Sequence, residues 1–204
     1  MKEFWNERYA QIEYAYGEAP NVYLQENLAQ FSTGRILFAA EGEGRNAVFA
    51  ATLGWEVAAF DLSESGKIKA EALAKKNSVS IDYQVSEFGE LSYPLEKFDA
   101  IALIYAHFPA AVKSTYHKKL ISYLKKGGIV IFEAFSKNHL HFQRENPHVG
   151  GPQSLEMLFS TTEIEQDFAN FEIIELEEKI IQLREGVYHQ GEGSVIRFIG
   201  RKKD

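Results

Sequence analysis

Cysteine is absent from the 204-residue sequence. Disulfides, thiolate zinc sites and cysteine nucleophiles are therefore excluded, and several enzyme classes with them. Long apolar runs are absent too, since no stretch approaches the ~18 apolar residues that a membrane span needs. The first residues mix charges with aromatics instead of forming the apolar core of a signal peptide. We expect a cytoplasmic protein without a membrane partner.

Proline, repeats and positive charge are scarce as well. The five prolines and the lack of a low-complexity tract predict neither a linker nor a repeat architecture. The 29 acidic residues outnumber the 22 basic ones and give a formal charge of −7, whereas surfaces that bind nucleic acid are usually basic. A hydrophobic fraction of 45% suits one well-buried domain. The composition therefore predicts a single domain over residues 1–204 with no nucleic-acid partner.

Apolar runs alternate with helical patterns along the first two thirds of the chain. The apolar runs predict strands over residues 35–40, 56–61, 80–88, 98–106 and 129–135, the last entered through Gly127-Gly128. The segments between them predict helices over residues 20–31, opened by Pro20, and over 46–54, 64–77 and 110–126. Strands separated by helices imply right-handed βαβ units, which build an α/β fold around a parallel sheet.

The last third of the sequence departs from this alternation. An irregular segment rich in histidine leads to a short predicted helix over residues 161–169. Two long strand patterns follow, over residues 171–186 and 193–203, and a turn containing glycine joins them. Strands joined by such a turn run antiparallel, so we expect the sheet to end in an antiparallel hairpin.

A glycine-containing turn follows the first predicted strand, in the stretch "RILFAAEGEGRNAVFAATLGWEVAAFDLS". Gly42 and Gly44 lie where a helix begins, and such a helix end offers free backbone N–H groups and the positive end of a dipole. Asp61 lies 19 residues beyond Gly42, at the end of the second strand, where a carboxylate can accept both hydroxyls of a ribose. The pattern favours an adenosine site over a role of Asp61 in helix capping alone.

Two cofactor classes are compatible with this turn. The pattern Gly42-x-Gly44-x-x-Ala47 is that of dinucleotide folds and predicts an NAD(P)-dependent oxidoreductase. The other class is S-adenosylmethionine, whose amino-acid portion occupies the glycine turn. Glu41 and Glu43 favour the second class, because carboxylates oppose a pyrophosphate but suit a sulfonium and an ammonium group.

Two further features favour S-adenosylmethionine. The antiparallel ending is typical of methyltransferase sheets and unusual in nicotinamide folds. The sequence "VSEF" follows the third strand, so that Glu87 can accept a hydrogen bond from an adenine amino group while Phe88 covers the ring. A solvated acid beside a core phenylalanine is the simpler alternative for this pair.

The sequence resembles the class I S-adenosylmethionine-dependent methyltransferases, and among them the tellurite-resistance (TehB)-like branch. The motifs that carry the resemblance occur in the expected order: "YAYGEAPN", "AAEGEGRNAVFAA", "AFDLS", "VSEF", "YAHFP", "LKKGGIVIFEAF" and "GSVIRFIGRK". The resemblance implies a three-layer Rossmann-like fold with a mostly parallel seven-stranded sheet and a C-terminal antiparallel hairpin. It also implies a helical lid over residues 1–32 and a sheet core over residues 33–204.

The same resemblance assigns cofactor contacts by position. It implies that the methionine portion lies on Gly42, Gly44 and Asn46, with Tyr105 beside it, that the ribose lies on Asp61 and Leu62, and that the adenine lies on Glu87 and Phe88. The chain departs from the family where Ala40 replaces the acid usual at the strand end and Asn46 the third glycine. Glu41, one place later, is a substitute for that acid, or the ammonium group is held in another way.

The N-terminal segment resembles the lid that closes over the cofactor in this family. It carries a cation and several rings in a short stretch: Trp5, Arg8, Tyr9, Tyr14 and Tyr16. We expect Tyr16 nearest the cofactor, and Arg8 and Tyr9 toward the acceptor, with Arg8 able to pair with a carboxylate. Packing on the sheet edge is the alternative role, and it suits the tryptophan better than the arginine.

The segment after the fourth strand is expected to face the transferred methyl group. His107 can take a proton from a hydroxyl or thiol acceptor at neutral pH, and it can equally well fix the loop by a hydrogen bond. Tyr105 and Phe108 adjoin it, and Glu133 at the end of the fifth strand can reach the acceptor pocket. Four late histidines, His139, His141, His148 and His189, lack the spacing of a metal site, so we expect no metal.

The functional prediction is a methyltransferase that uses S-adenosylmethionine and acts on a small-molecule acceptor, with tellurite resistance as the family link. The alternatives are the NAD(P)-dependent oxidoreductase and a module that binds the cofactor without catalysis.

Overall fold

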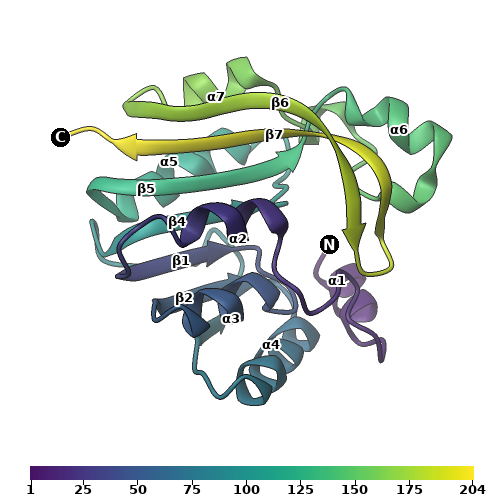
Figure 1. Ribbon diagram of the computed structural model, residues 1–204, viewed down its shortest axis with the longest axis horizontal. Helices are drawn as coiled ribbons and strands as arrows, with labels where there is room; N and C mark the ends of the chain where they lie inside the picture. Colours follow the sequence, from purple (N-terminus) through teal and green to yellow (C-terminus); the bar gives the residue numbers. More distant parts are fainter.

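Seven strands form one sheet in the computed structural model, which describes all 204 residues (Figure 1). The order across the sheet is β3-β2-β1-β4-β5-β7-β6. Strands β1 to β5 are parallel, and β7 runs antiparallel to both β5 and β6. The strands are β1 (Arg35–Ala39), β2 (Glu56–Asp61), β3 (Asp82–Val85), β4 (Phe98–Ile104), β5 (Leu124–Phe135), β6 (Phe171–Glu185) and β7 (His189–Lys202). The expected α/β fold with an antiparallel ending is confirmed.

Helices cover both faces of the sheet, so that alternate strand residues enter two separate cores. Strand residues such as Phe38 and Ile131 pack with α2, α3 and α4, whereas Phe132 and Leu103 pack with α5 and α7. The helices are α1 (Lys2–Tyr9), α2 (Val22–Leu28), α3 (Arg45–Thr52), α4 (Glu64–Lys76), α5 (Lys113–Tyr123), α6 (His139–Glu145) and α7 (Thr161–Asp167). No helix has the length and apolar character needed to cross a membrane.

Three local expectations need correction. Helix α2 begins at Val22, because the Asn21 side chain caps it by accepting from the Leu24 N–H, so Pro20 lies before the helix. Strand β5 begins at Leu124 and contains Gly127-Gly128, where its register with β4 shifts. The histidine-rich segment is largely regular, with α6 followed by the short helices η1 (Pro147–Val149) and η2 (Leu155–Met157).

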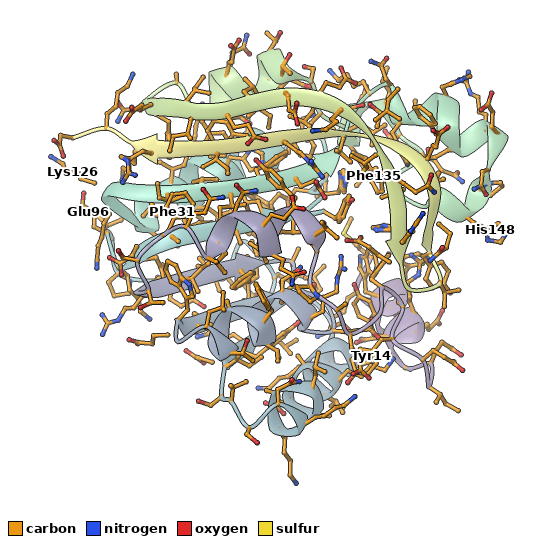
Figure 2. The ribbon with its side chains drawn as sticks, viewed as in Figure 1. Tyr14, Phe31, Glu96, Lys126, Phe135 and His148 are labelled. Atoms are coloured by element: carbon orange, nitrogen blue, oxygen red, sulfur yellow. The ribbon has the colours of Figure 1, made fainter.

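The carboxyl ends of the parallel strands lie under a cover made of two distant segments. The tip of the β6–β7 hairpin bends over this edge and meets the chain that follows α1 (Figure 1). The Val187 N–H donates to the Ala15 carbonyl at 2.9 Å. A Cβ at Gly186 would lie 2.4 Å from that same carbonyl oxygen, so the close approach requires glycine. In Figure 2 Tyr14 lies toward this edge, while Glu96 and Lys126 lie at the opposite edge.

Candidate active site

The turn after β1 holds its own glutamate at the start of α3. Glu41 Oε1 accepts hydrogen bonds from the backbone N–H groups of Asn46, at 2.9 Å, and Ala47, at 2.7 Å. These are the donors that a helix N-terminus offers to an anion. A pyrophosphate would have to displace this carboxylate, so the turn lacks the anchor that the oxidoreductase interpretation requires. The Glu41 carboxylate thus acts as a helix cap inside the chain.

Burial raises the pKa of Glu41 to about 7, and this predicts a pH-dependent stability. The folded pKa lies above the ordinary value of 4.5, so the folded state binds more protons than the unfolded chain between pH 4.5 and 7. Stability contributed by this group is therefore lost as the pH rises through that window. Glu41→Gln, whose amide oxygen still accepts, should gain stability relative to wild type from pH 5 to pH 8 in urea unfolding. Glu172 is exposed, so the unfolding free energy of Glu172→Gln should change with pH as that of wild type does. A difference in unfolding free energy between Glu41→Gln and wild type that stays constant from pH 5 to pH 8 would contradict the prediction.

Gly44 serves helix packing. It is the residue before α3, with φ +85°, and a Cβ there would lie 2.4 Å from the Ala70 Cβ of α4. Gly44→Ala is therefore expected to lose stability twice: about 1–2 kcal/mol for the left-handed backbone and about 1–3 kcal/mol for the clash. Gly54→Ala is the matched control, because Gly54 has φ +92° and open space around its Cβ position. Equal losses of unfolding free energy in the two variants would contradict this packing role.

Asp61 closes the turn from the end of β2. Its Oδ2 accepts from the Gly42 N–H at 3.1 Å and its Oδ1 from the Ser63 N–H at 2.9 Å. Burial raises its pKa to about 6, against the lowering effect of these backbone donors. Each carboxylate oxygen has a second lone pair, so the group can still accept from a ribose. The structure thus brings Gly42 and Asp61 together as the sequence predicts, with Leu62 next to them.

Helix α1 lies directly on this pair. A Cβ at Gly42 would lie 2.6 Å from the Tyr9 hydroxyl oxygen, and its three nearest atoms all belong to the Tyr9 side chain, so this side of the glycine faces the Tyr9 ring. The Trp5 ring stacks on Tyr9 at 5.3 Å, and Asn6 Oδ1 accepts from the Ser63 hydroxyl at 2.7 Å. Gly42 and Asp61 therefore form a cradle of the kind that a nucleoside needs, and the Tyr9 side chain of α1 lies over it. The residue types present fit S-adenosylmethionine.

The expected adenine residues point in different directions. The Glu87 side chain is exposed, in the segment after β3. Phe88 is buried, stacks on Tyr116 with ring centroids 3.9 Å apart, and packs against Phe108 at 5.3 Å. The rings of Phe88 and Phe108 therefore belong to the hydrophobic core in this conformation.

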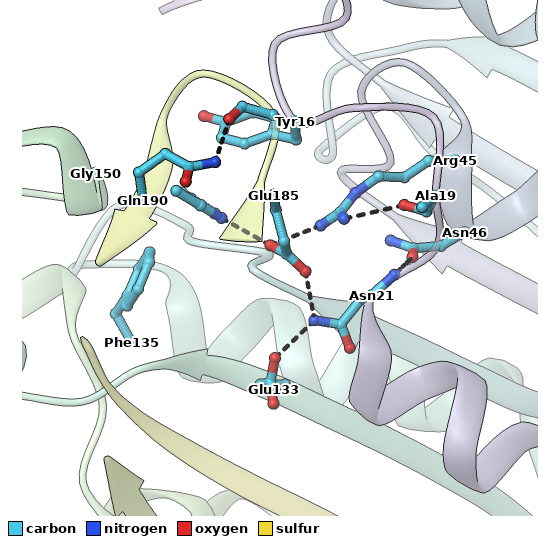
Figure 3. A network of polar contacts seen from close by, with 12 residues as sticks. Tyr16, Ala19, Asn21, Arg45, Asn46, Glu133, Phe135, Gly150, Glu185 and Gln190 are labelled. Carbon is cyan, nitrogen blue, oxygen red and sulfur yellow. Dashed lines mark hydrogen bonds and ion pairs between the residues drawn. The ribbon is translucent and has the colours of Figure 1, made fainter. Parts of the chain in front are cut away.

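A polar network under the hairpin tip connects four parts of the chain (Figure 3). The Asn21 side-chain amide donates to Glu133 at 2.7 Å and to Glu185 at 3.0 Å. Glu185 also pairs with Arg45, at the start of α3, at 3.0 Å and with His189 at 2.9 Å. Its partner Arg45 is only 8% exposed. Except for Glu133 as an acceptor-side residue, sequence reasoning missed this network.

The charges of the network are fixed by their partners. Burial opposes ionisation of Glu185, yet Arg45 and His189 hold its pKa down at about 2. Burial raises the pKa of Glu133 in spite of its ion pair with Arg197, 2.7 Å long. Every charged group here is therefore already neutralised by another residue of the chain. The network connects Asn21, the cap of α2, to the start of α3 and to the sheet.

His107 is held by backbone groups on both sides. Its Nδ1 lies 3.1 Å from the Met157 carbonyl and its Nε2 accepts from the Phe135 N–H at 3.4 Å. Both contacts are satisfied by the neutral ring protonated at Nδ1. Burial lowers the pKa of His107 to about 3. This geometry matches the loop-fixing role and leaves no free nitrogen for proton transfer.

The remaining predicted residues are placed as follows. Arg8 donates to the Tyr16 hydroxyl at 3.1 Å and lies over the Tyr188 ring at 4.2 Å, so it contacts rings and no carboxylate. Tyr16 packs against His189 with centroids 4.5 Å apart. Asn46 Oδ1 accepts from the Asn21 N–H at 2.9 Å. No group of three histidines or acids is gathered in a way that could hold a metal.

The comparison with protein families gives one match. Residues 36–128, from β1 to the glycines inside β5, match the model of a methyltransferase domain. The matched segment contains the glycine turn, Asp61 and Tyr105. No curated protein matches the sequence.

Solved structures share the fold at low sequence identity. One, described as "Conversion of a Disulfide Bond into a Thioacetal Group during Echinomycin Biosynthesis", is 18% identical with a TM-score of 0.78 over 100% of this chain and 92% of that chain. TehB from Haemophilus influenzae is 16% identical with a TM-score of 0.73 over 99% of this chain and 67% of that chain. Magnesium protoporphyrin IX methyltransferase from Synechocystis, with bound SAH, is 15% identical, with a TM-score of 0.66 over 88% of this chain and 80% of that chain.

Proposed function

We propose that the chain is an S-adenosylmethionine-dependent methyltransferase that transfers the methyl group to a small-molecule acceptor at the carboxyl edge of the sheet. The match of residues 36–128 to a methyltransferase-domain model and the shared fold support this proposal. The observation that carries this proposal is the covered cradle of Gly42 and Asp61, with Tyr105 directly after β4 and Glu133 near the end of β5. The acidic net charge and the closed lid favour a small acceptor over a macromolecule.

The cofactor residues have separate tasks in this proposal. S-adenosylmethionine supplies an electrophilic methyl group when bound. Asp61 accepts hydrogen bonds from the ribose hydroxyls, and Gly42 lets the ligand approach the backbone. Gly44 and Glu41 maintain the turn, because one packs against α4 and the other caps α3. Asn46 acts through Asn21, whose N–H it binds.

Alignment and water exclusion account for the acceleration in this proposal. Methyl transfer needs in-line approach of a nucleophile, and proximity alone supplies much of the effect. The lid residues Arg8, Tyr9 and Tyr16 exclude water from the edge, while His107 holds the loop after β4 against β5. Since His107 has no free nitrogen, the acceptor arrives anionic or loses its proton to solvent. Sulfur and other soft nucleophiles meet this requirement most easily near neutral pH.

Two structural neighbours are consistent with soft acceptors. One concerns conversion of a disulfide into a thioacetal, and the other is TehB. We infer an acceptor of this chemical kind, with a tellurium oxyanion as one member of the class.

Radiolabelled methyl transfer over a panel of thiols, chalcogen oxyanions, catechols and amines tests the proposal. We expect transfer to at least one thiol or chalcogen oxyanion. Failure of the whole panel by a protein that binds S-adenosylhomocysteine would favour a binding module without catalysis. Activity confined to a macromolecular substrate would overturn the small-molecule assignment.

Cofactor binding should change the fluorescence of Trp5. The Tyr9 ring covers Gly42 and stacks on Trp5, so a ligand in the cradle must move α1. Addition of S-adenosylhomocysteine should shift the tryptophan emission of wild type and of Trp55→Phe, since Trp55 is buried in the core. Trp5→Phe should lose the shift. A ligand-induced shift that survives in Trp5→Phe would show that α1 stays in place.

A further inference from the structure

The chain that follows α1 is fastened to α4, beside which it passes (Figure 1). The Tyr14 hydroxyl donates to the Lys69 carbonyl of α4 at 3.1 Å. In return the Lys69 ammonium group donates to the Glu13 carbonyl at 2.6 Å and lies 4.9 Å from the centroid of the Tyr14 ring. The loop and the helix thus exchange a hydrogen bond in each direction. We call residues 13–16 the strap.

Glu43, between the two glycines of the turn, binds the same strap. Its Oε2 accepts from the Ala15 N–H at 2.7 Å, and its Oε1 pairs with Lys69 at 2.7 Å. The side chains of Glu43 and Lys69 are only 3% and 15% exposed. Burial raises the pKa of Glu43, while Lys69 and the backbone of Ala15 and Tyr16 oppose this rise. The strap and α4 therefore occupy the Glu43 carboxylate, whereas the sequence pattern suggested a cofactor cation as its partner.

The position of α1 depends on the strap. Helix α1 ends at Tyr9, and only the exposed residues 10–12 join Tyr9 to Glu13. The Tyr9 ring covers Gly42 and also lies close to α4, since a Cβ at Gly66 would be 3.2 Å from the Tyr9 Cδ2 and 2.8 Å from the Gly42 carbonyl oxygen. Because so few residues join them, fixing the strap keeps Tyr9 close to the cradle.

We propose that the Glu43–Lys69 ion pair is a latch that keeps the strap and α1 closed over the cradle, so that its opening controls the entry of the ligand. Both are then positioning residues, which act through the position of Tyr9. Opening returns the two charges to water, and their hydration offsets much of the lost attraction, so the latch can open while the chain stays folded. That the entering ligand is S-adenosylmethionine rests on the proposed function.

Hydrogen exchange of the protein without ligand tests whether the pair holds the strap. Lys69→Met keeps the aliphatic stem and removes both donated hydrogen bonds, and the double variant Glu43→Gln/Lys69→Met leaves no buried charge unpaired. Residues 10–17 should exchange about tenfold faster in both variants, and residues 36–39 of β1 as in wild type. Lys67→Met is the matched control, because Lys67 lies on the same helix in an exposed pair with Glu71 and should leave both segments unchanged.

The rate of ligand entry provides a readout that a merely structural role would not move. The association rate of S-adenosylhomocysteine, followed by tryptophan emission in stopped flow, should rise about tenfold in Lys69→Met and in the double variant. The reason is that the closed form, which excludes the ligand, becomes less populated. Lys67→Met should associate at the wild-type rate.

Four outcomes count against the inference. Exchange of residues 10–17 at the wild-type rate in both latch variants would show that the pair does not hold the strap. Equal acceleration in residues 36–39 would reduce the pair to a contributor to global stability. Faster exchange of residues 10–17 with an unchanged association rate would separate the strap from ligand entry. A wild-type protein that binds no S-adenosylhomocysteine would refute the proposed function and the control of entry, and the exchange rates alone would then decide whether the pair holds α1.

Discussion

Glu185→Ala is expected to lower the free energy of unfolding by about 3–5 kcal/mol, the cost of leaving a buried charge without its partner. Glu185 is the carboxylate that pairs with Arg45, and the two side chains are 11% and 8% exposed. The substitution also removes an acceptor from Asn21 and the partner of His189. Because these groups belong to the N-terminal segment, the start of α3 and β7, the hairpin tip should detach from the N-terminal segment. Hydrogen exchange of residues 182–190 should rise together with the loss of stability.

The matched control for this prediction lies on the same strand. Glu172 is exposed and has no ion pair, so Glu172→Ala should change the unfolding free energy by less than about 0.5 kcal/mol. Glu185→Gln keeps an acceptor for Asn21, so its loss of unfolding free energy should lie between those of Glu172→Ala and Glu185→Ala. An unfolding free energy of Glu185→Ala within 1 kcal/mol of wild type would mean that Arg45 finds other partners, as expected of a flexible surface pair.

Asp61→Ala is expected to weaken binding of S-adenosylhomocysteine by more than tenfold, on the order of the ~1.5–3 kcal/mol of lost charge-assisted hydrogen bonds. Asp61 is the acid at the end of β2, and it accepts from the N–H of Gly42, the glycine that the Tyr9 side chain covers. The same change removes the acceptors of the Gly42 and Ser63 N–H groups, so stability falls too. Asp61→Asn is the sharper variant, since its amide oxygen retains one of these contacts.

Calorimetric titration distinguishes the two roles of Asp61. Weak binding by a folded Asp61→Asn variant would assign the side chain to the cofactor. Unchanged affinity, with a loss of stability alone, would reduce Asp61 to a residue that shapes the turn. Glu56→Ala, at the other end of β2, is exposed and should leave the affinity unchanged.

Much of the fold could be predicted because its signals are local. Buried parallel strands are continuous apolar runs, as in Ile36 to Ala39, and helices between them leave little choice of topology. The hairpin follows from two long strand patterns around Gly186. Its place in the sheet, with β7 inserted between β5 and β6, depends on pairing across more than fifty residues and has no local signal. The sequence did not predict helix α6, because histidine and asparagine have a low intrinsic helix propensity.

Part of the candidate site, too, could be predicted from the sequence, and part could not. Gly42 and Asp61 were predicted together because the carboxyl ends of adjacent parallel strands meet at one edge. The Glu185 network could not be predicted, since an ordinary glutamate before a turn becomes a buried partner of Arg45 only after the hairpin bends over the edge. For Glu41 the sequence left open how the acid is used, and the backbone contacts of Asn46 and Ala47 decide it.

Calorimetric titration of the wild-type protein with S-adenosylhomocysteine and with NADH tests the central claim most directly. The cradle of Gly42 and Asp61 and the capped start of α3 predict one site for S-adenosylhomocysteine and no binding of NADH. Binding of NADH with none of S-adenosylhomocysteine would contradict the account, because a pyrophosphate would then occupy the backbone donors that Glu41 holds.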